Sequence, residues 1–232
     1  MVPLKDDNPT RLTPVVTYVF VGVNIFVFLY QVGLSQAGLE DFFRTWAVVP
    51  ADLSASFAGQ ASPMVWITLL TSQFMHGGIL HLGGNMLYLW VFGNNIEDKL
   101  GHLRYVLFYL GCGVLASLSQ WFFSQSSTVP SLGASGAIAG VMGAYILRFP
   151  RAQILTLFPI FFFITTIRIP AIVFLGIWFV QQALYGIASL SVPTDMGQGG
   201  IAYWAHAGGF VFGALLGPMF GLFNDASGQR RY

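Results

Sequence analysis

Apolar residues run through this chain in long blocks that are separated by short polar stretches. A block of about 20 residues is what a helix needs to cross the hydrocarbon core of a bilayer. Six such blocks are present, near residues 14–34, 79–97, 103–124, 134–149, 169–190 and 201–223. The pattern predicts an all-α membrane protein with six transmembrane helices.

Two further apolar stretches, residues 64–75 and 154–167, are shorter. Each is too short to cross a bilayer comfortably, and the second contains Pro159, so we expect both to be interfacial or re-entrant pieces. The first of them belongs to a long loop, residues 35–78, that carries the segment LEDFFRTWAVVPADL. Acidic and aromatic residues in such a mixture favour the headgroup region, which predicts a long membrane-associated first loop.

Composition agrees with a chain that lies mostly inside a membrane. Hydrophobic residues make up 55% of the 232 residues and charged residues only 8%, whereas a soluble domain has roughly 25% charged residues. Little of the chain remains for a soluble domain. The formal net charge of +1 argues against nucleic acid as a partner, because that would require a clustered basic surface.

The positions of the charges predict the orientation of the helices. Short cytoplasmic loops collect Lys and Arg, and six spans with a cytoplasmic N-terminus leave only Arg44 outside. We therefore expect a cytoplasmic segment at 1–12, the helical domain at 13–223 and a cytoplasmic tail at 224–232. The expected cytoplasmic cations are Lys5, Arg11, Lys99, Arg104, Arg148, Arg151, Arg168, Arg230 and Arg231.

Two polar positions near the expected inner surface need an interpretation of their own. Glu97 and Asp98 lie at the inner end of the second apolar block, and we expect both at the membrane interface. His102 follows among basic residues and is predicted to be solvated.

Four polar residues share one depth in this topology. Ser135 opens the fourth span, His206 lies near the start of the sixth, and His81 and Asn85 lie near the start of the second. All three spans enter the membrane from the outer side. Because polar groups inside a membrane are costly, each of these residues is a candidate for function.

The chemistry of the four residues fits a single hydrolytic reaction. A serine hydroxyl is a weak nucleophile until a base takes its proton, and histidine suits that role near neutral pH. Ser135 would attack and His206 would be the base, without a carboxylate, because the fourth and sixth spans contain neither Asp nor Glu. His81 and Asn85 are four residues apart, so they share a helix face and can stabilise an oxyanion together with backbone N–H groups at Ser135.

Glycines provide a way for the serine and the histidine to meet. Gly209 and Gly213 fall on the same stripe as His206, and Gly136 directly follows Ser135. Small residues at such spacings let transmembrane helices approach closely. Spacing alone still leaves other roles open, because a serine in a membrane helix often serves packing and a histidine can belong to a proton path.

At this point the chain resembles the rhomboid family of intramembrane serine proteases. The motifs are HGGILHLGGNMLYLW (76–90), GNNIEDKLG (93–101), GASG (133–136) and AHAGGFVFG (205–213), and the resemblance runs from about residue 12 to 223. It implies a six-helix rhomboid bundle in which Ser135 is the nucleophile and His206 the base. It also implies that His81 and Asn85 stabilise the oxyanion and that Gly133 is the glycine preceding the nucleophile.

The resemblance further implies cleavage of transmembrane or juxtamembrane segments of other membrane proteins, without a metal or a cofactor. The loop at 191–200 would cap the site, and the fifth span would be the mobile side of a substrate gate. One departure concerns the first loop, which lacks the adjacent Trp-Arg pair of some bacterial members, since Arg44 and Trp46 are separated by one residue.

Two alternatives belong to other functional classes. A proteolytically inactive relative that binds and escorts membrane proteins would share the fold, but such proteins typically lack the serine or the histidine. A small transporter would also be polytopic, but the chain has no inverted repeat and no paired broken helices. Without a transit peptide or a cytosolic extension, we expect a prokaryotic plasma membrane with both termini cytoplasmic; the substrate and the oligomeric state stay open.

Overall fold

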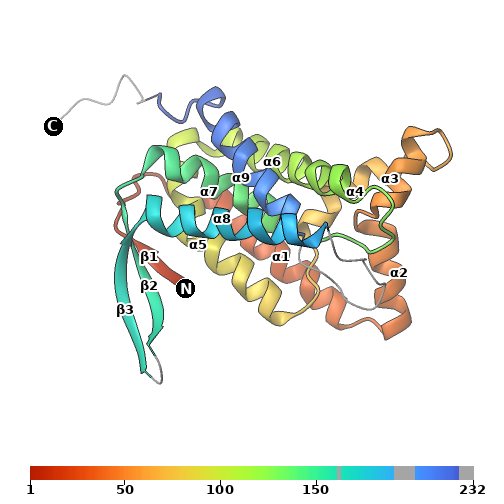
Figure 1. The fold of residues 1–232 in the computed structure, drawn as a ribbon, viewed down its shortest axis with the longest axis horizontal. Coiled ribbons are helices and arrows are strands. Elements are labelled where there is room, and N and C mark those ends of the chain that lie inside the picture. Colours follow the sequence, from red (N-terminus) through yellow and green to blue (C-terminus); the bar gives the residue numbers. More distant parts are fainter. Residues whose placement is uncertain (161–162, 191–201, 225–232) are drawn as a thin grey trace.

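The computed structural model describes residues 1–160, 163–190 and 202–224 of the chain. Long helices pack into a bundle (Figure 1), with a small sheet at one end and a group of short helices at the other. The long helices are α1 (Val15–Val32), α5 (Ile79–Leu100), α6 (His102–Phe123), α7 (Ser135–Arg148), α8 (Ala171–Ser189) and α9 (Tyr203–Met219).

Each of the six apolar blocks coincides, within a few residues, with one of these helices. Among the described residues, α1, α6 and α8 are long and apolar enough to cross a membrane. The other three differ for visible reasons: α5 ends in a polar segment that includes Glu97 and Asp98, and α7 and α9 are shorter, with 14 and 17 residues. The chain is thus a mostly helical membrane protein.

Helix α7 lies at the centre of the bundle and contacts α5, α6, α8 and α9. Every residue from Gly136 to Tyr145 is buried. Glycines allow this crowding where α7 meets α9, since a Cβ at Gly213 would overlap the backbone of Gly140 and one at Gly209 would overlap the carbonyl of Gly136. The two backbones are therefore in direct contact along the glycine stripe.

The first loop folds into short helices at one end of the bundle (Figure 1). They are α2 (Gln36–Trp46), α3 (Pro50–Phe57), α4 (Val65–Thr71) and the 3₁₀ helix η1 (Ser72–Phe74). Ser35 precedes α2 and caps it, because its Oγ accepts a hydrogen bond from Gly38 N at 3.2 Å. The short stretch at 64–75 thus forms α4 and η1, the elements that lead into α5.

A three-stranded antiparallel sheet departs from the all-α expectation. Its strand order is β1 (Val2–Asp6), β2 (Gln153–Ile160) and β3 (Phe163–Pro170). The stretch at 154–167, expected to be an interfacial or re-entrant piece, is therefore a hairpin in which Leu157 pairs with Thr166. Its β-branched Ile and Thr residues favour strands, a signal that hydropathy does not reveal.

Glu97, which we expect at the depth of the membrane interface, is buried within the protein. The residue is fully buried, and its carboxylate accepts hydrogen bonds from Val16 N, Thr17 N and Thr17 Oγ1 at 2.7–2.8 Å. These donors belong to the first turn of α1, where backbone N–H groups lack partners in the helix. His102 Nδ1 lies 2.6 Å from the same carboxylate, so His102 is bonded to Glu97 although its side chain is 45% exposed.

Candidate active site

Ser135 is the first residue of α7, and the preceding loop is held against η1. Gly133 N donates a hydrogen bond to Ser72 O at 2.9 Å. Gly133 has a φ of +126°, and a Cβ there would lie 2.9 Å from His81 Nε2. Both the backbone conformation and the lack of space therefore require glycine two residues before Ser135.

Ser135 and His206 meet where α7 and α9 begin. Ser135 Oγ lies 2.7 Å from His206 Nε2, which is hydrogen-bonding distance. His206 is in the first turn of α9, and the glycine contacts described above bring this turn close to the start of α7.

The second ring nitrogen of His206 also has a partner. Its Nδ1 lies 2.8 Å from Oε1 of Gln182 on α8. Because an amide oxygen only accepts hydrogen bonds, Nδ1 carries the ring proton. Nε2 then presents its lone pair, and the Ser135 hydroxyl donates to it. This is the protonation state in which His206 can accept the serine proton.

His81 and Asn85 lie on one face of α5, beside Gly133. Gly77 N donates to His81 Nδ1 at 3.4 Å, which leaves the proton on Nε2, the atom that faces Gly133. A Cβ on Gly133 would lie 3.7 Å from Nδ2 of Asn85. Two side-chain donors thus converge on the loop that leads into Ser135.

His76 is hydrogen-bonded to Asn85, a contact that the sequence did not reveal. Asn85 Nδ2 donates to His76 Nε2 at 2.9 Å, so the proton of this ring is on Nδ1. Burial, with a smaller contribution from His81, lowers the pKa of His76 to about 3. His76 is also held by α1, since Gln31 Nε2 donates to His76 O at 2.8 Å.

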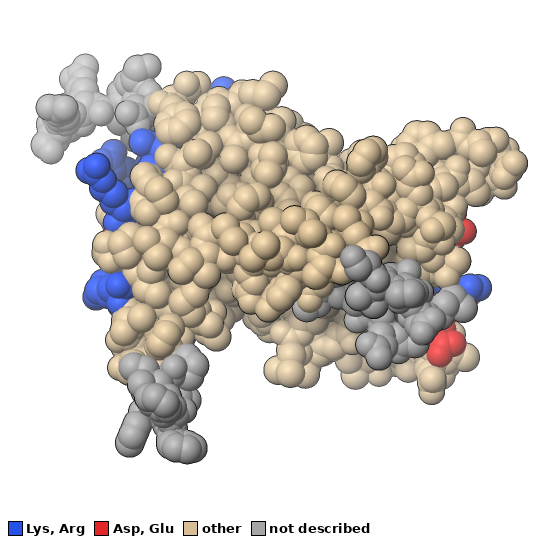
Figure 2. Space-filling view, viewed as in Figure 1, with Lys and Arg blue, Asp and Glu red and all other residues tan. Residues whose placement is uncertain are grey.

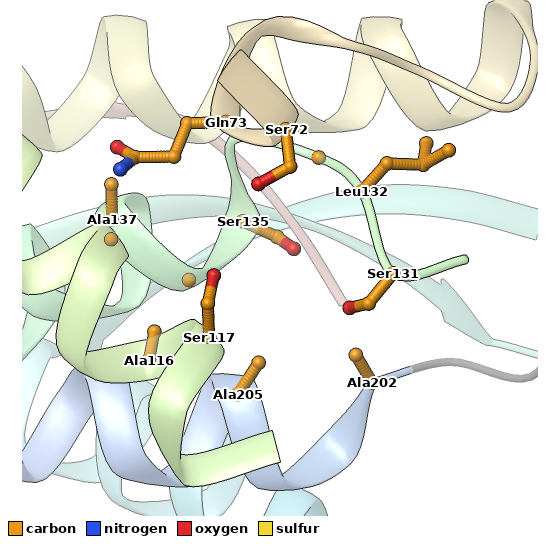
Figure 3. A pocket seen from close by; sticks show the side chains of 13 residues that line it. Ser72, Gln73, Ala116, Ser117, Ser131, Leu132, Ser135, Ala137, Ala202 and Ala205 are labelled. Carbon is orange, nitrogen blue, oxygen red and sulfur yellow. The ribbon is translucent and has the colours of Figure 1, made fainter. Parts of the chain in front are cut away.

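A small pocket opens beside Ser135 (Figure 3). Its empty volume is about 310 Å³, which includes space open to solvent. The lining comes from η1, α6, the loop before α7 and the start of α9, and its side chains are mostly short. They include Ser72, Ser117, Ser131, Ala116, Ala202 and Ala205. The nucleophile candidate is therefore open to small molecules such as water.

Gln182 is the site residue that sequence analysis missed. A carboxylate is the usual partner of such a base, and none is present in α7, α8 or α9. The signal was nevertheless present, because Gln181 and Gln182 interrupt an otherwise apolar helix and polar residues within such helices are costly. The loop at 191–200 and the tail after residue 224 lie outside the described residues.

Comparison with known proteins yields a consistent set of relatives. The family model described as "Rhomboid domain" matches residues 63–223. The chain is 29% identical to Rhomboid protein 1, mitochondrial, of Saccharomyces cerevisiae. The aligned 220 residues cover 92% of this chain and 56% of that protein. It is 30% identical over 218 residues to the rhomboid protease GluP of Bacillus subtilis, covering 90% of this chain and 36% of that protein.

A third relative is the bovine presenilin-associated rhomboid-like protein, mitochondrial. It is 27% identical over 197 residues, which cover 83% of this chain and 45% of that protein. The chain thus spans about half the length, or less, of these relatives.

Proposed function

The chain belongs to the rhomboid family, and we propose that it is an intramembrane serine endopeptidase that cleaves membrane proteins in or next to their transmembrane segments. The observation that carries this proposal is the 2.7 Å separation between Ser135 Oγ and His206 Nε2. The tautomer that Gln182 favours leaves Nε2 free to take the hydroxyl proton. Transmembrane proteins are the proposed substrates, and the protease would bind them within the lipid bilayer.

In the first half of the reaction, Ser135 Oγ attacks the carbonyl carbon of the peptide bond while its proton passes to His206 Nε2. The resulting tetrahedral intermediate carries a negative charge on the former carbonyl oxygen. Collapse of the intermediate breaks the C–N bond, and His206 gives the proton to the departing amine. The substrate's N-terminal part is then an ester of Ser135.

In the second half, water replaces the amine. His206 takes a proton from the water as its oxygen attacks the ester, and the proton then returns to Ser135 Oγ when the acid product leaves. The pocket beside Ser135 offers room for this water, and its lining includes hydroxyl groups.

We assign the oxyanion to donors at the mouth of α7. The backbone N–H groups at the start of a helix lack partners within it, and the helix dipole favours negative charge there. His81 and Asn85 add side-chain donors from α5. Gly133, Gly136, Gly209 and Gly213 serve the site indirectly, by letting the loop and the helices come close.

The membrane topology is part of the same proposal. We propose six spans, residues 13–223 as the protease domain and short cytoplasmic ends at 1–12 and 224–232. Figure 2 supports this orientation, because Lys and Arg gather mainly at the end with the sheet, while Asp and Glu are visible at the end with α2. The first loop would then lie on the outer membrane surface. The relatives include mitochondrial and bacterial proteins and give the expected plasma membrane no support.

A serine-reactive fluorophosphonate tests the proposal on detergent-purified protein. We expect the wild type to be labelled and both Ser135→Ala and His206→Ala to be unlabelled, because the probe reacts only with an activated hydroxyl. Ser56→Ala on α3 is the matched control and should be labelled like the wild type. An unlabelled wild type with its fold intact would overturn the proposal and favour an inactive escort protein.

A further inference from the structure

The amide of Gln182 is placed by packing between α8 and α9. Gln182 is only 8% exposed, and its neighbours one helical turn away on α8 are Trp178 and Gly186. The Trp178 ring lies 5.9 Å from the His206 ring, measured between centroids. A Cβ at Gly186 would lie 3.1 Å from Trp204 Cε2, so α8 and α9 touch closely on this side of Gln182 too.

Aromatic contacts extend the same helix contact on either side. Phe179 stacks on Phe210 with centroids 4.8 Å apart, and Tyr185 lies 5.3 Å from Tyr203. These rings fix the position of α8 on α9, since tightly packed side chains occupy defined rotamers. Gln182 therefore reaches His206 from a helix that packs closely on α9 on both sides of the contact.

The contact with Gln182 determines which ring nitrogen of His206 carries the proton. With the Gln182 oxygen facing the ring, Nδ1 must be the donor and Nε2 the acceptor toward Ser135. In the other tautomer Nε2 would carry the proton and could not take a second one from the serine. The position of one amide oxygen thus decides whether the ring can be a base.

We propose that Gln182 is the positioning residue of the dyad, which holds His206 in the rotamer and tautomer that can accept the Ser135 proton. This inference rests on the proposed function. When Nε2 takes the proton, the imidazole ring becomes positively charged and Nδ1–H keeps its hydrogen bond to the Gln182 carbonyl. The negative end of the carbonyl dipole stabilises this charge but does not neutralise it. Gln182 thus occupies the place that an aspartate holds in a triad, but as a neutral acceptor.

Charged groups around His206 are few, so a change at Gln182 should be measurable. Helices α6, α7, α8 and α9 contain no Asp or Glu. Apart from His206 itself, their basic residues are His102 and Arg104 at the start of α6 and Arg148 at the end of α7. The other histidine with a role in the proposed reaction is His81 from α5, which lies beside Gly133. Gln182→Glu would therefore place a carboxylate against Nδ1, and no other acid belongs to these four helices.

Two substitutions of Gln182 separate the acceptor from the shape of the side chain. Gln182→Met keeps the length and loses the acceptor, so we expect kcat to fall by about 10- to 100-fold with little change in KM. Gln182→Glu restores an acceptor, so kcat should recover. The acid limb of its pH–rate profile should move to higher pH by about one unit or more, because a carboxylate favours the protonated imidazole.

The matched control is Gln181→Met, which makes the same substitution at the residue directly before Gln182 in α8. Gln181 is exposed, and its amide lies 3.4 Å from Tyr185 Oη. Its kcat and pH profile should equal those of the wild type, and thermal unfolding should show that all variants are folded. A Gln182→Met variant with wild-type kcat and pH profile would overturn the inference.

A ¹⁵N NMR spectrum of the histidine rings tests the tautomer without relying on turnover. In the wild type we expect the His206 Nδ1 signal to be of the protonated type and Nε2 of the unprotonated type, with a mixture in Gln182→Met. Protonation at Nε2 in the wild type would overturn the inference even if the enzyme is active. A wild type that neither labels nor cleaves, yet shows the expected tautomer, would instead count against the proposed function.

Discussion

The two ends of α5 differ in how well their polar groups are paired. Near the C-terminal end, hydrogen-bond donors surround the Glu97 carboxylate. Glu97 accepts from Val16 and Thr17 and contacts His102. Near the N-terminal end, by contrast, Asn85 is bonded to His76, and His76 Nδ1 is buried without a hydrogen-bond partner among the described residues.

This difference suggests that the polar groups near Glu97 serve the stability of the fold and that those near Ser135 serve the reaction. A buried polar group that is fully paired stabilises one arrangement of the chain, because any other arrangement leaves it unpaired. Unused donors and acceptors cost free energy in the resting protein but are free to bind water or a reacting group. We therefore expect substitutions near Glu97 to affect folding and those near Ser135 to affect turnover.

The largest effect is expected from Ser135→Ala, which should lower the cleavage rate by at least about 10⁴-fold because the nucleophile is lost. The unfolding temperature should change little, since only one hydroxyl is removed. Cleavage of a transmembrane substrate in proteoliposomes and thermal unfolding of the same sample measure the two effects. Turnover within 100-fold of the wild type would contradict the assignment of the nucleophile.

Glu97→Ala should show the opposite pattern. Removing the carboxylate leaves the donors at the start of α1 and His102 without their partner, and we expect a loss of about 3–5 kcal/mol in the free energy of unfolding. The turnover of the folded fraction should stay near that of the wild type. Denaturant titration measures the loss, with Glu40→Ala on α2 as a surface control within about 0.5 kcal/mol of the wild type.

Asn85→Ala removes one donor to the proposed oxyanion and should lower kcat by about 10²- to 10³-fold. Steady-state kinetics on a transmembrane substrate measures this. Asn94→Ala on the same helix is the control, because Asn94 bonds only to its neighbour Asn95 among the contacts that the structure gives. Equal kcat values for the two variants would remove Asn85 from the oxyanion site.

At pH 7 the smallest effect is expected at His76, whose contribution to stability changes only when the pH is lowered. Its pKa is about 3 in the folded protein and about 6.5 when unfolded. Between these values the unfolded chain binds the extra proton, so stability falls as the pH falls through this window, by up to about 1.4 kcal/mol per unit. The loss is complete below the folded pKa.

His76→Gln checks this dependence, because glutamine can still accept from Asn85 but does not titrate. Unfolding free energies measured from pH 7 to pH 4 should fall less steeply in this variant than in the wild type. Identical slopes would show that another group is responsible.

The helices and the main candidate residues could be predicted from the sequence because both rest on local information. Apolar blocks of sufficient length predict helices wherever they pack. Ser135, His206, His81 and Asn85 were identifiable because polar residues are rare in such blocks. The hairpin of β2 and β3 was missed because a short apolar run does not distinguish a strand from an interfacial piece. The burial of Glu97 was not foreseen because its partners come from α1, 80 residues earlier.

The sequence by itself therefore determined which chemistry is available, since it supplied a serine, histidines and an asparagine within apolar helical blocks. Only the tertiary structure decided how this chemistry is arranged. A hydrogen bond requires two atoms about 3 Å apart, and the contact of His206 with Gln182 joins helices through residues 24 positions apart. No local pattern encodes such a distance, because packing of α8 on α9 sets it.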